Sequence, residues 1–381
     1  MPLYTVLLVT LASGAPSGCR EGLAPFAPET EEPDTSAVRR LTFNPGEDVD
    51  PVFLSNDSVM YAAESFPGIP GGRGLLVVTS IHGGAARLLL ADVQGQTALG
   101  PRWLAQPARS PFLDRLAFIE VASIATPLTV TGAEPCPVRE PLLDSLVLRI
   151  LTTPSAGPLS PTDPARAVRL EGRDPRQKAG LTGPWETGLH PFQATFLQDR
   201  KLPLHPSWSR DGVRIVFSDG LGLHLWNGNS AIAPVALAGT SDGVSPSWSP
   251  DGEWIAFTRL VRGEATRAAC AVSAGNTTQT QNRTGWDITA RRLELIRPDG
   301  NGTRTLGEGE DPAWSADSRT IFVRRAGAIW AVPLDGNAPT LVPGTEGGRQ
   351  PAVAPDSRHL VFVRPGSNPD THDVWVVRLA R

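Results

Sequence analysis

A short pattern that starts with proline recurs along this chain of 381 residues. Its clearest copy begins Pro246-Ser247-Trp248, passes through a Pro-Asp-Gly turn at 250–252 and continues into an apolar run at 254–257. Two apolar runs joined by such a turn are typical of a β-hairpin. The other copies start at Pro51, Pro101, Pro206, Pro312 and Pro351. The recurrence predicts an all-β chain built from repeated hairpin units.

The spacing of the copies predicts the architecture. Successive copies are 50, 105, 40, 66 and 39 residues apart, and the short intervals match the ~40 to 45 residues of one four-stranded propeller blade. We therefore expect six blades, with insertions near 121–142, 152–190 and 260–290. A seventh blade between 119 and 201 is the alternative. The tryptophans of the pattern are expected to pack between neighbouring blades rather than to stack on a ligand.

The two ends of the chain predict how the ring closes. The last copy offers strands near 351–354, 359–364 and 374–379, which is one strand fewer than a complete blade. A strand at 38–43 has the form of the outer strands that precede other copies. We expect it to join the C-terminal blade and so to close a six-bladed β-propeller over residues 38–381.

These residues resemble a known family. The run Pro-x-Trp-Ser-Pro-Asp-Gly before an Ile-Ala-Phe strand, as at 246–257, is similar to the repeat of TolB-type β-propellers. The resemblance covers about 38–381. It implies six blades and a periplasmic protein that works by binding other proteins. The namesake's N-terminal α/β domain has no counterpart in the few residues before the first strand, so its partner contacts are not carried over.

The first residues predict the location. An apolar run at 3–12 has the length of a signal-peptide core, and the small residues before Cys19 resemble the end of a bacterial lipoprotein signal. The match departs at Pro16, where a Leu-like residue is usual, and no basic residue precedes the run. We expect residues 1–19 to be this signal, Cys19 to be lipidated and 20–37 to be a flexible tether. The protein would then be periplasmic or on the outer envelope surface, held to a membrane by lipid or by a retained apolar segment.

Two further cysteines, Cys136 and Cys270, fall in the insertions of different blades. In an oxidising compartment they could form a disulfide. Because sequence does not bring them together, we favour two free or buried thiols. Two cysteines without a nearby Cys or His predict no metal site.

Catalytic patterns are weak. The run 239–243 matches Gly-x-Ser-x-Gly, but no helix follows it, as a nucleophile elbow requires. We therefore expect a loop, no catalytic residue and no cofactor. Six histidines are present: His82, His190, His205, His224, His359 and His372. Acidic residues before the repeats could in principle hold Ca²⁺, although they are ordinary turn residues: Asp48, Asp50, Asp242, Glu308, Glu310 and Asp311.

The insertions offer a binding surface, because long irregular loops on a rigid ring often carry function. Trp286, at the end of the polar 260–290 insertion, and Trp185, in the Pro- and Gly-rich stretch 157–188, are candidate interaction residues. Net charge is −4, and no basic stripe predicts nucleic-acid binding. We expect a non-catalytic, envelope-associated propeller that binds or scaffolds envelope or membrane proteins. The alternative is a glycan-binding or glycan-cleaving propeller with a metal in its funnel.

Overall fold

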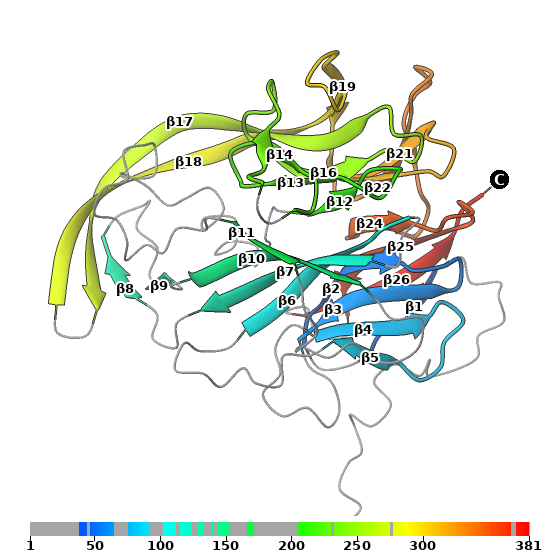
Figure 1. The fold of residues 1–381 in the computed structure, drawn as a ribbon, viewed down its shortest axis with the longest axis horizontal. Helices are drawn as coiled ribbons and strands as arrows, with labels where there is room; N and C mark the ends of the chain where they lie inside the picture. The colour runs from blue at the N-terminus through cyan, green and yellow to red at the C-terminus, as the bar shows by residue number, and fades with distance from the viewer. Residues whose placement is uncertain are drawn as a thin grey trace, which may run out of the picture.

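The computed structural model consists of antiparallel sheets arranged around a centre (Figure 1). It describes residues 38–43, 46–64, 75–90, 102–111, 115–123, 128–132, 139–140, 143–152, 166–170, 205–229, 232–274, 277–366 and 371–380. These residues form six sheets. The predicted all-β, six-bladed propeller is therefore confirmed. Within the same ranges, no helix has the length and apolar character needed to cross a membrane.

Each blade is a four-stranded antiparallel meander whose first strand lies at the centre of the ring. The strands, in order from the centre outwards, are β2 (Asp48–Phe53), β3 (Ser58–Ala63), β4 (Leu75–Ser80) and β5 (Arg87–Leu90) in blade 1; β6 (Arg102–Arg109), β7 (Arg115–Ser123), β10 (Leu143–Thr152) and β11 (Arg166–Leu170) in blade 2; β12 (Ser207–Trp208), β13 (Ile215–Ser218), β14 (Leu223–Trp226) and β15 (Val235–Ala236) in blade 3; β16 (Gly243–Trp248), β17 (Ile255–Ala274), β18 (Thr277–Ile296) and β19 (Arg304–Glu308) in blade 4; β20 (Glu310–Trp314), β21 (Thr320–Arg325), β22 (Ala328–Pro333) and β23 (Thr340–Leu341) in blade 5; and β24 (Arg349–Val353), β25 (His359–Pro365), β26 (His372–Arg378) and β1 (Val38–Arg40) in blade 6.

The N-terminal strand closes the ring as the sequence predicts. β1 pairs antiparallel with β26, with Val38 opposite Val377 and Arg40 opposite Trp375. Arg40 forms an ion pair with Asp373 at 2.9 Å, and the backbone N–H of Val374 donates to the Thr42 hydroxyl. The first and last parts of the chain thus share one blade, which leaves no open joint in the ring.

The strands that could have built a seventh blade belong to existing sheets. Between residues 119 and 201, β10 and β11 complete blade 2, and the short strands β8 (Leu128–Thr131) and β9 (Arg139–Glu140) extend the sheet of blade 4. Residues 171–204 lie outside the described ranges.

Blade 4 carries a long two-stranded extension, which we call the arm (residues 260–290 of β17 and β18). The two strands pair from Ile255 opposite Ile296 to Ala274 opposite Thr277, and the arm curves away from the ring (Figure 1). The expected irregular loop is therefore wrong. Alternating small and polar residues favour a ladder here, and β8 adds to the edge of β17 at 271–273.

The interior is divided into clusters that lie between neighbouring sheets. Trp208, Trp248 and Trp314 each belong to such a cluster and are at most 7% exposed. The indole N–H of Trp208 donates to the Ala108 carbonyl at 2.8 Å, and that of Trp314 donates to the Ser247 carbonyl at 2.9 Å. The prediction that these tryptophans pack between blades is confirmed.

The sequence alignment of blade 2 is wrong by six residues. The sequence pattern predicts the repeat at Pro101, but Pro107 occupies the inner-strand position that Pro206 and Pro246 occupy in their blades. The backbone N–H of Ser110 bonds the Arg115 carbonyl, just as Ser209 bonds Arg214 in blade 3. The error arose because Pro101 is followed by a tryptophan two residues later, whereas Pro107 is not.

Cys270 corrects a second expectation. It is fully buried and disulfide-bonded, so the prediction of a free thiol is wrong for this residue. Its bonding partner lies outside the described residues, as does Cys136. Cys270 precedes Ala271, which pairs with Thr131 of β8. Tertiary pairing thus brings together insertions of two blades that are far apart in sequence.

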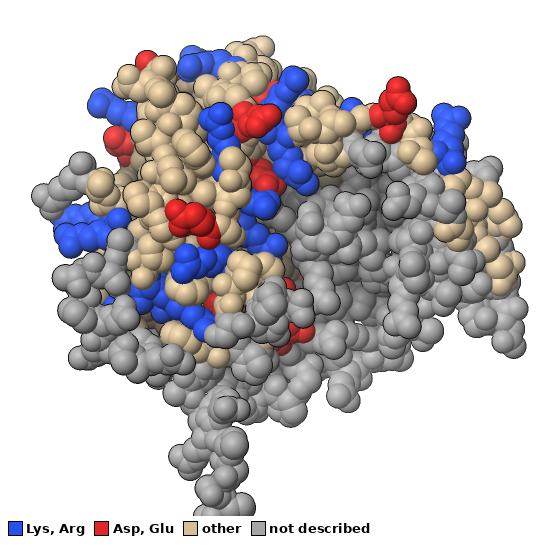
Figure 2. Space-filling view, turned by 180° about the vertical axis from the view of Figure 1, so that it is seen from behind, with Lys and Arg blue, Asp and Glu red and all other residues tan. Residues whose placement is uncertain are grey.

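Charged side chains of both signs lie together on one face of the described structure. Figure 2 shows arginines and acidic residues interspersed on the face seen from behind.

Candidate functional site

Six polar residues with left-handed backbone conformation surround the centre of the propeller. These residues, which we call the polar ring, are Asp50, Gln106, His205, Ser245, Asp311 and Gln350, with φ between 35° and 55°. Each immediately precedes the proline of its inner strand. Non-glycine residues in this region cost of order 1–3 kcal/mol each, so the surrounding structure must hold them there.

Local sequence explains this conformation. A proline has no N–H to give to a strand ladder, so within sheets it is confined to edges and bulges. In blades 1, 2, 4, 5 and 6 the register between first and second strands shifts at the polar-ring residue and its proline. The bulge turns the polar side chain toward the neighbouring blade.

Hydrogen bonds run from blade to blade around the polar ring. The Gln350 side chain accepts from the Asp50 backbone N–H at 3.2 Å and donates to the Asp50 carboxylate at 2.6 Å. That carboxylate accepts from the Gln106 N–H at 3.1 Å, and the Gln106 side chain accepts from the His205 N–H at 2.8 Å. On the other side, the Ser245 hydroxyl donates to Asp311 at 3.1 Å. These side chains therefore join adjacent blades.

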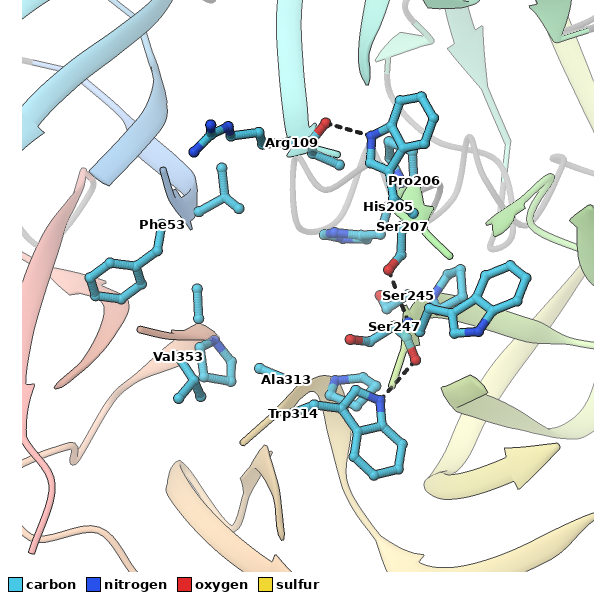
Figure 3. Close-up of a pocket in the computed structure, with 18 of the residues that line it drawn as sticks. Phe53, Arg109, His205, Pro206, Ser207, Ser245, Ser247, Ala313, Trp314 and Val353 are labelled. Atoms are coloured by element: carbon cyan, nitrogen blue, oxygen red, sulfur yellow. Dashed lines mark hydrogen bonds between the residues drawn. The ribbon is translucent and has the colours of Figure 1, made fainter. Parts of the chain in front are cut away.

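A cavity of about 460 Å³ extends along the inner strands from the polar ring. It reaches Arg109, Arg210, Pro250 and Pro355 near the turns that join first and second strands. Its wall combines the six inner-strand prolines with Phe53 and the pattern tryptophans. Figure 3 shows the His205 ring projecting toward the middle of this space. The cavity is a preformed, mixed apolar and polar site of the size that binds small molecules or a projecting segment of a protein.

The turns beside the cavity are fixed by a repeated hydrogen-bond pattern. In blade 4 the Ser249 hydroxyl donates to the Asp251 carboxylate at 2.5 Å, and that carboxylate accepts from the Glu253 N–H. In blade 3 the equivalent bonds from the Ser209 hydroxyl and the Val213 N–H lower the pKa of Asp211. Such turns give the cavity a rigid mouth.

The Gly-x-Ser-x-Gly pattern is a structural turn, as expected. The Thr240 hydroxyl donates to the Leu237 carbonyl and accepts from the Leu223 N–H, and the Gly243 N–H bonds the Thr240 carbonyl. Thr345 makes the same three bonds in the turn that leads from blade 5 to blade 6. A Cβ on Gly243 would lie 2.7 Å from the Thr240 carbonyl oxygen. Glycine is needed for this close approach, not for a nucleophile.

Of the five histidines that the structure describes, only His205 lines the cavity. His372 contacts Glu47 at 3.0 Å, and His224 contacts Asp219 at 3.1 Å while stacking on Phe217. His82 pairs with Asp57 at an exposed turn. His359 lies in β25, and His190 lies outside the described residues.

The acidic residues considered for Ca²⁺ lie in different environments, and Glu308 is exposed at the end of β19. Asp50 and Asp311 belong to the polar ring, and Asp48 is fully buried. Asp242 pairs with Arg262, and Glu310 pairs with Arg291 and Arg324. Among the described residues, no three or more His, Cys, Asp or Glu side chains are grouped so as to hold a metal.

The candidate interaction residues Trp286 and Trp185 and the candidate lipidation site Cys19 stay predictions. Trp286 lies in β18 of the arm opposite Ala265. Trp185 and Cys19 lie outside the described residues. Sequence reasoning missed the polar ring as a unit, although a polar residue before each inner-strand proline is a signal that the repeat alignment could have used.

No protein-family model matches this sequence, and no curated protein matches it. Solved structures do show similarity. A TolB from Acinetobacter baumannii is 13% identical with a TM-score of 0.44, and the match covers 85% of this chain and 64% of that one. This chain thus spans less than two thirds of that TolB.

Two other similar structures have different activities in their descriptions. An oligogalacturonate lyase in complex with manganese is 11% identical with a TM-score of 0.42, covering 90% of this chain and 80% of that one. The hydrazine synthase of Kuenenia stuttgartiensis is 10% identical with a TM-score of 0.43, covering 86% and 94%. The β-propeller fold is shared by proteins with unrelated functions, so function must be argued from the site.

Proposed function

We propose that this chain is a non-catalytic, envelope-associated β-propeller that binds other proteins, with the central cavity as its main binding site. The observation that carries the proposal is the hydrogen bonding of the polar ring. Three side chains of the polar ring each accept a hydrogen bond from the backbone N–H of the polar-ring residue in the next blade: Gln350 from Asp50, Asp50 from Gln106, and Gln106 from His205. Polar side chains used in this way build a rigid wall, which favours binding without the ordering cost of a flexible site.

The disulfide at Cys270 supports a location outside the cytoplasm. Disulfides persist in oxidising compartments and are rare in the bacterial cytoplasm. The lipidation of Cys19 and the membrane anchor are part of this proposal. They place the propeller beside the envelope proteins that we expect as partners.

A cavity-filling substitution tests the binding site. Val353 lines the cavity, and Val353→Trp would occupy part of it. Val235 is 67% exposed on the outer edge of blade 3, so Val235→Trp is the matched control. Wild type and both variants would be recovered from native membranes in mild detergent, with mass spectrometry of co-purified proteins and of the N-terminal peptide.

We expect envelope proteins at stoichiometric levels with wild type and Val235→Trp, and their loss with Val353→Trp. Equal recovery with both variants would remove the cavity from the proposal. A solitary protein that instead binds oligosaccharides or retains a metal on purification would overturn it in favour of the glycan-active alternative.

A further inference from the structure

Four arginines lie at the ends of blade strands on the face opposite the first-to-second-strand turns. Arg40 ends β1, Arg259 follows the core of β17, Arg291 lies where β18 re-enters blade 4, and Arg324 lies near the end of β21. We call these residues the arginine rim. In a propeller meander, second strands end and third strands begin on one face, so the four belong to the same side of the ring.

Each arginine of the rim covers a more deeply buried carboxylate. Arg40 pairs with Asp373, whose side chain is 3% exposed, and Arg259 pairs with Glu294, whose side chain is 6% exposed. Desolvation by burial raises the pKa of Asp373. The acids thus lie beneath the surface, and the guanidinium groups lie between them and solvent.

The junction of blades 4 and 5 has two arginines for one acid. Arg291 contacts one Glu310 oxygen at 3.1 Å, and Arg324 contacts the other at 2.5 Å. Both arginine side chains are about 40% exposed, against 15% for Glu310. A guanidinium has five N–H donors, and Glu310 uses only part of this set. The triad has a net charge of +1 and exposed donors.

An approaching molecule meets the arginines first. The guanidinium groups are the more exposed partners, with side chains 18–41% exposed against 3–15% for the carboxylates, so a molecule that touches the rim meets N–H donors before carboxylate oxygens. The rim therefore presents a positive surface although its total charge is only +1, from four arginines and the three acids Asp373, Glu294 and Glu310.

The charge pattern selects the kind of partner. Nucleic acids and anionic membranes are bound through many closely spaced cations, whereas this chain has a net charge of −4 and acidic residues are mixed with arginines on the face in Figure 2. At the triad, the two exposed guanidinium forks match single carboxylates, which a fork can bind through two parallel hydrogen bonds. The Arg259 guanidinium is instead already bonded to Glu294 and to the Ser241 and Gly239 carbonyls. We infer that the arginine rim, with Arg291 and Arg324 at its centre, binds an acidic segment of a partner protein.

A charge-matched pair of variants tests this inference on the full chain. The first is Arg291→Gln/Arg324→Gln/Glu310→Gln, which removes the triad without leaving an unpaired buried carboxylate. The control is Arg297→Gln/Arg304→Gln/Glu253→Gln. It removes two arginines that flank Trp254 and the acid near Arg297, and changes net charge by the same amount. Binding of a fluorescein-labelled hexaglutamate peptide would be followed by anisotropy at low and physiological salt.

We expect the triad variant to weaken peptide binding about tenfold or more at low salt, and the control variant to change it less than twofold. Equal weakening by both variants, or none by either, would overturn the inference. Binding of phosphatidylglycerol vesicles that needs the same arginines, without hexaglutamate binding, would overturn it in favour of a lipid surface.

Two further measurements keep the result interpretable. Should the triad variant fail to fold, Arg291→Lys/Arg324→Lys keeps the charge but loses the planar forks, and a two- to fivefold weakening is expected. Unchanged binding by a folded lysine variant would contradict carboxylate recognition. This inference is independent of the cavity: Val353→Trp should bind hexaglutamate like wild type, whichever way its partner test ends.

Discussion

Blades 3 and 4 share one inner hairpin and differ at the opposite end of their strands. In both, a Ser-x-Asp-Gly turn follows a buried tryptophan, and the glycine N–H bonds the serine carbonyl, at 2.8 Å for Gly212 and 2.9 Å for Gly252. Yet the second and third strands have four residues each in blade 3 and twenty in blade 4.

The comparison separates two tasks within one repeat. The hairpin near the cavity fixes how a blade contacts its neighbours, so it tolerates little change. The far ends of the second and third strands extend beyond the apolar clusters between blades, so blade 4 can lengthen them into the arm, whose edge pairs with β8. Residues can be added at these strand ends because no packed cluster between blades has to accommodate them.

Removing the shared tryptophan tests whether the two hairpins are equivalent. Trp208→Ala and Trp248→Ala should each reduce the free energy of unfolding by about 3–5 kcal/mol, because each empties a buried cluster between sheets. Urea unfolding of both variants measures this. If Trp248→Ala lost much less unfolding free energy than Trp208→Ala, the arm of blade 4 would be compensating for the missing tryptophan.

Breaking the disulfide tests the part that only blade 4 has. Cys270→Ser should lower stability by up to about 2–4 kcal/mol and should speed proteolytic cleavage near 264–269, where the arm is exposed. Limited proteolysis with mass spectrometry, with and without reductant, locates the cuts. Cleavage that is faster in blade 3 than in the arm would contradict this assignment.

The turn glycine of blade 4 tests the hairpin itself. Gly252 has φ +83°, so Gly252→Ala should cost roughly 1–2 kcal/mol. In blade 5 the same position is Ser318, with φ 59°, and its hydroxyl accepts the Asp251 N–H. Gly252→Ser should therefore cost less than Gly252→Ala in thermal unfolding. An equal cost would show that neighbouring turns are not interchangeable.

Acid titration gives the smallest effect. Hydrogen bonds from Ser209 and the Val213 N–H lower the pKa of Asp211 below its ordinary value of 3.8. The folded state therefore prefers the charged form, and this stabilisation is present above about pH 4 and lost as pH falls through the lower folded value. The stability deficit of Asp211→Asn, measured by urea unfolding, should shrink toward about pH 2. A constant deficit would contradict the hydrogen-bond assignment.

Prediction from sequence succeeds where a contact recurs with the repeat and fails where a segment departs from the repeat. Ring closure by residues 38–40 and the packing of Trp208 join distant residues, yet the repeat predicts both, because each blade follows the same local pattern. The pattern places the blade 2 repeat at Pro101 because Trp103 follows it, whereas the structure places it at Pro107, before the turn at Ser110. The strands of the arm were missed because a polar ladder has no apolar alternation to reveal it.

The sequence by itself determined the six-bladed ring, because proline, turn residues and alternating apolar runs act within a few residues of one another. Only the tertiary structure decided what lies between blades. The polar ring joins Asp50 to Gln350 across 300 residues, and the disulfide of Cys270 and the placement of Arg291 and Arg324 on one glutamate depend on blade packing. Such contacts depend on the relative placement of sheets, which no short stretch of chain specifies.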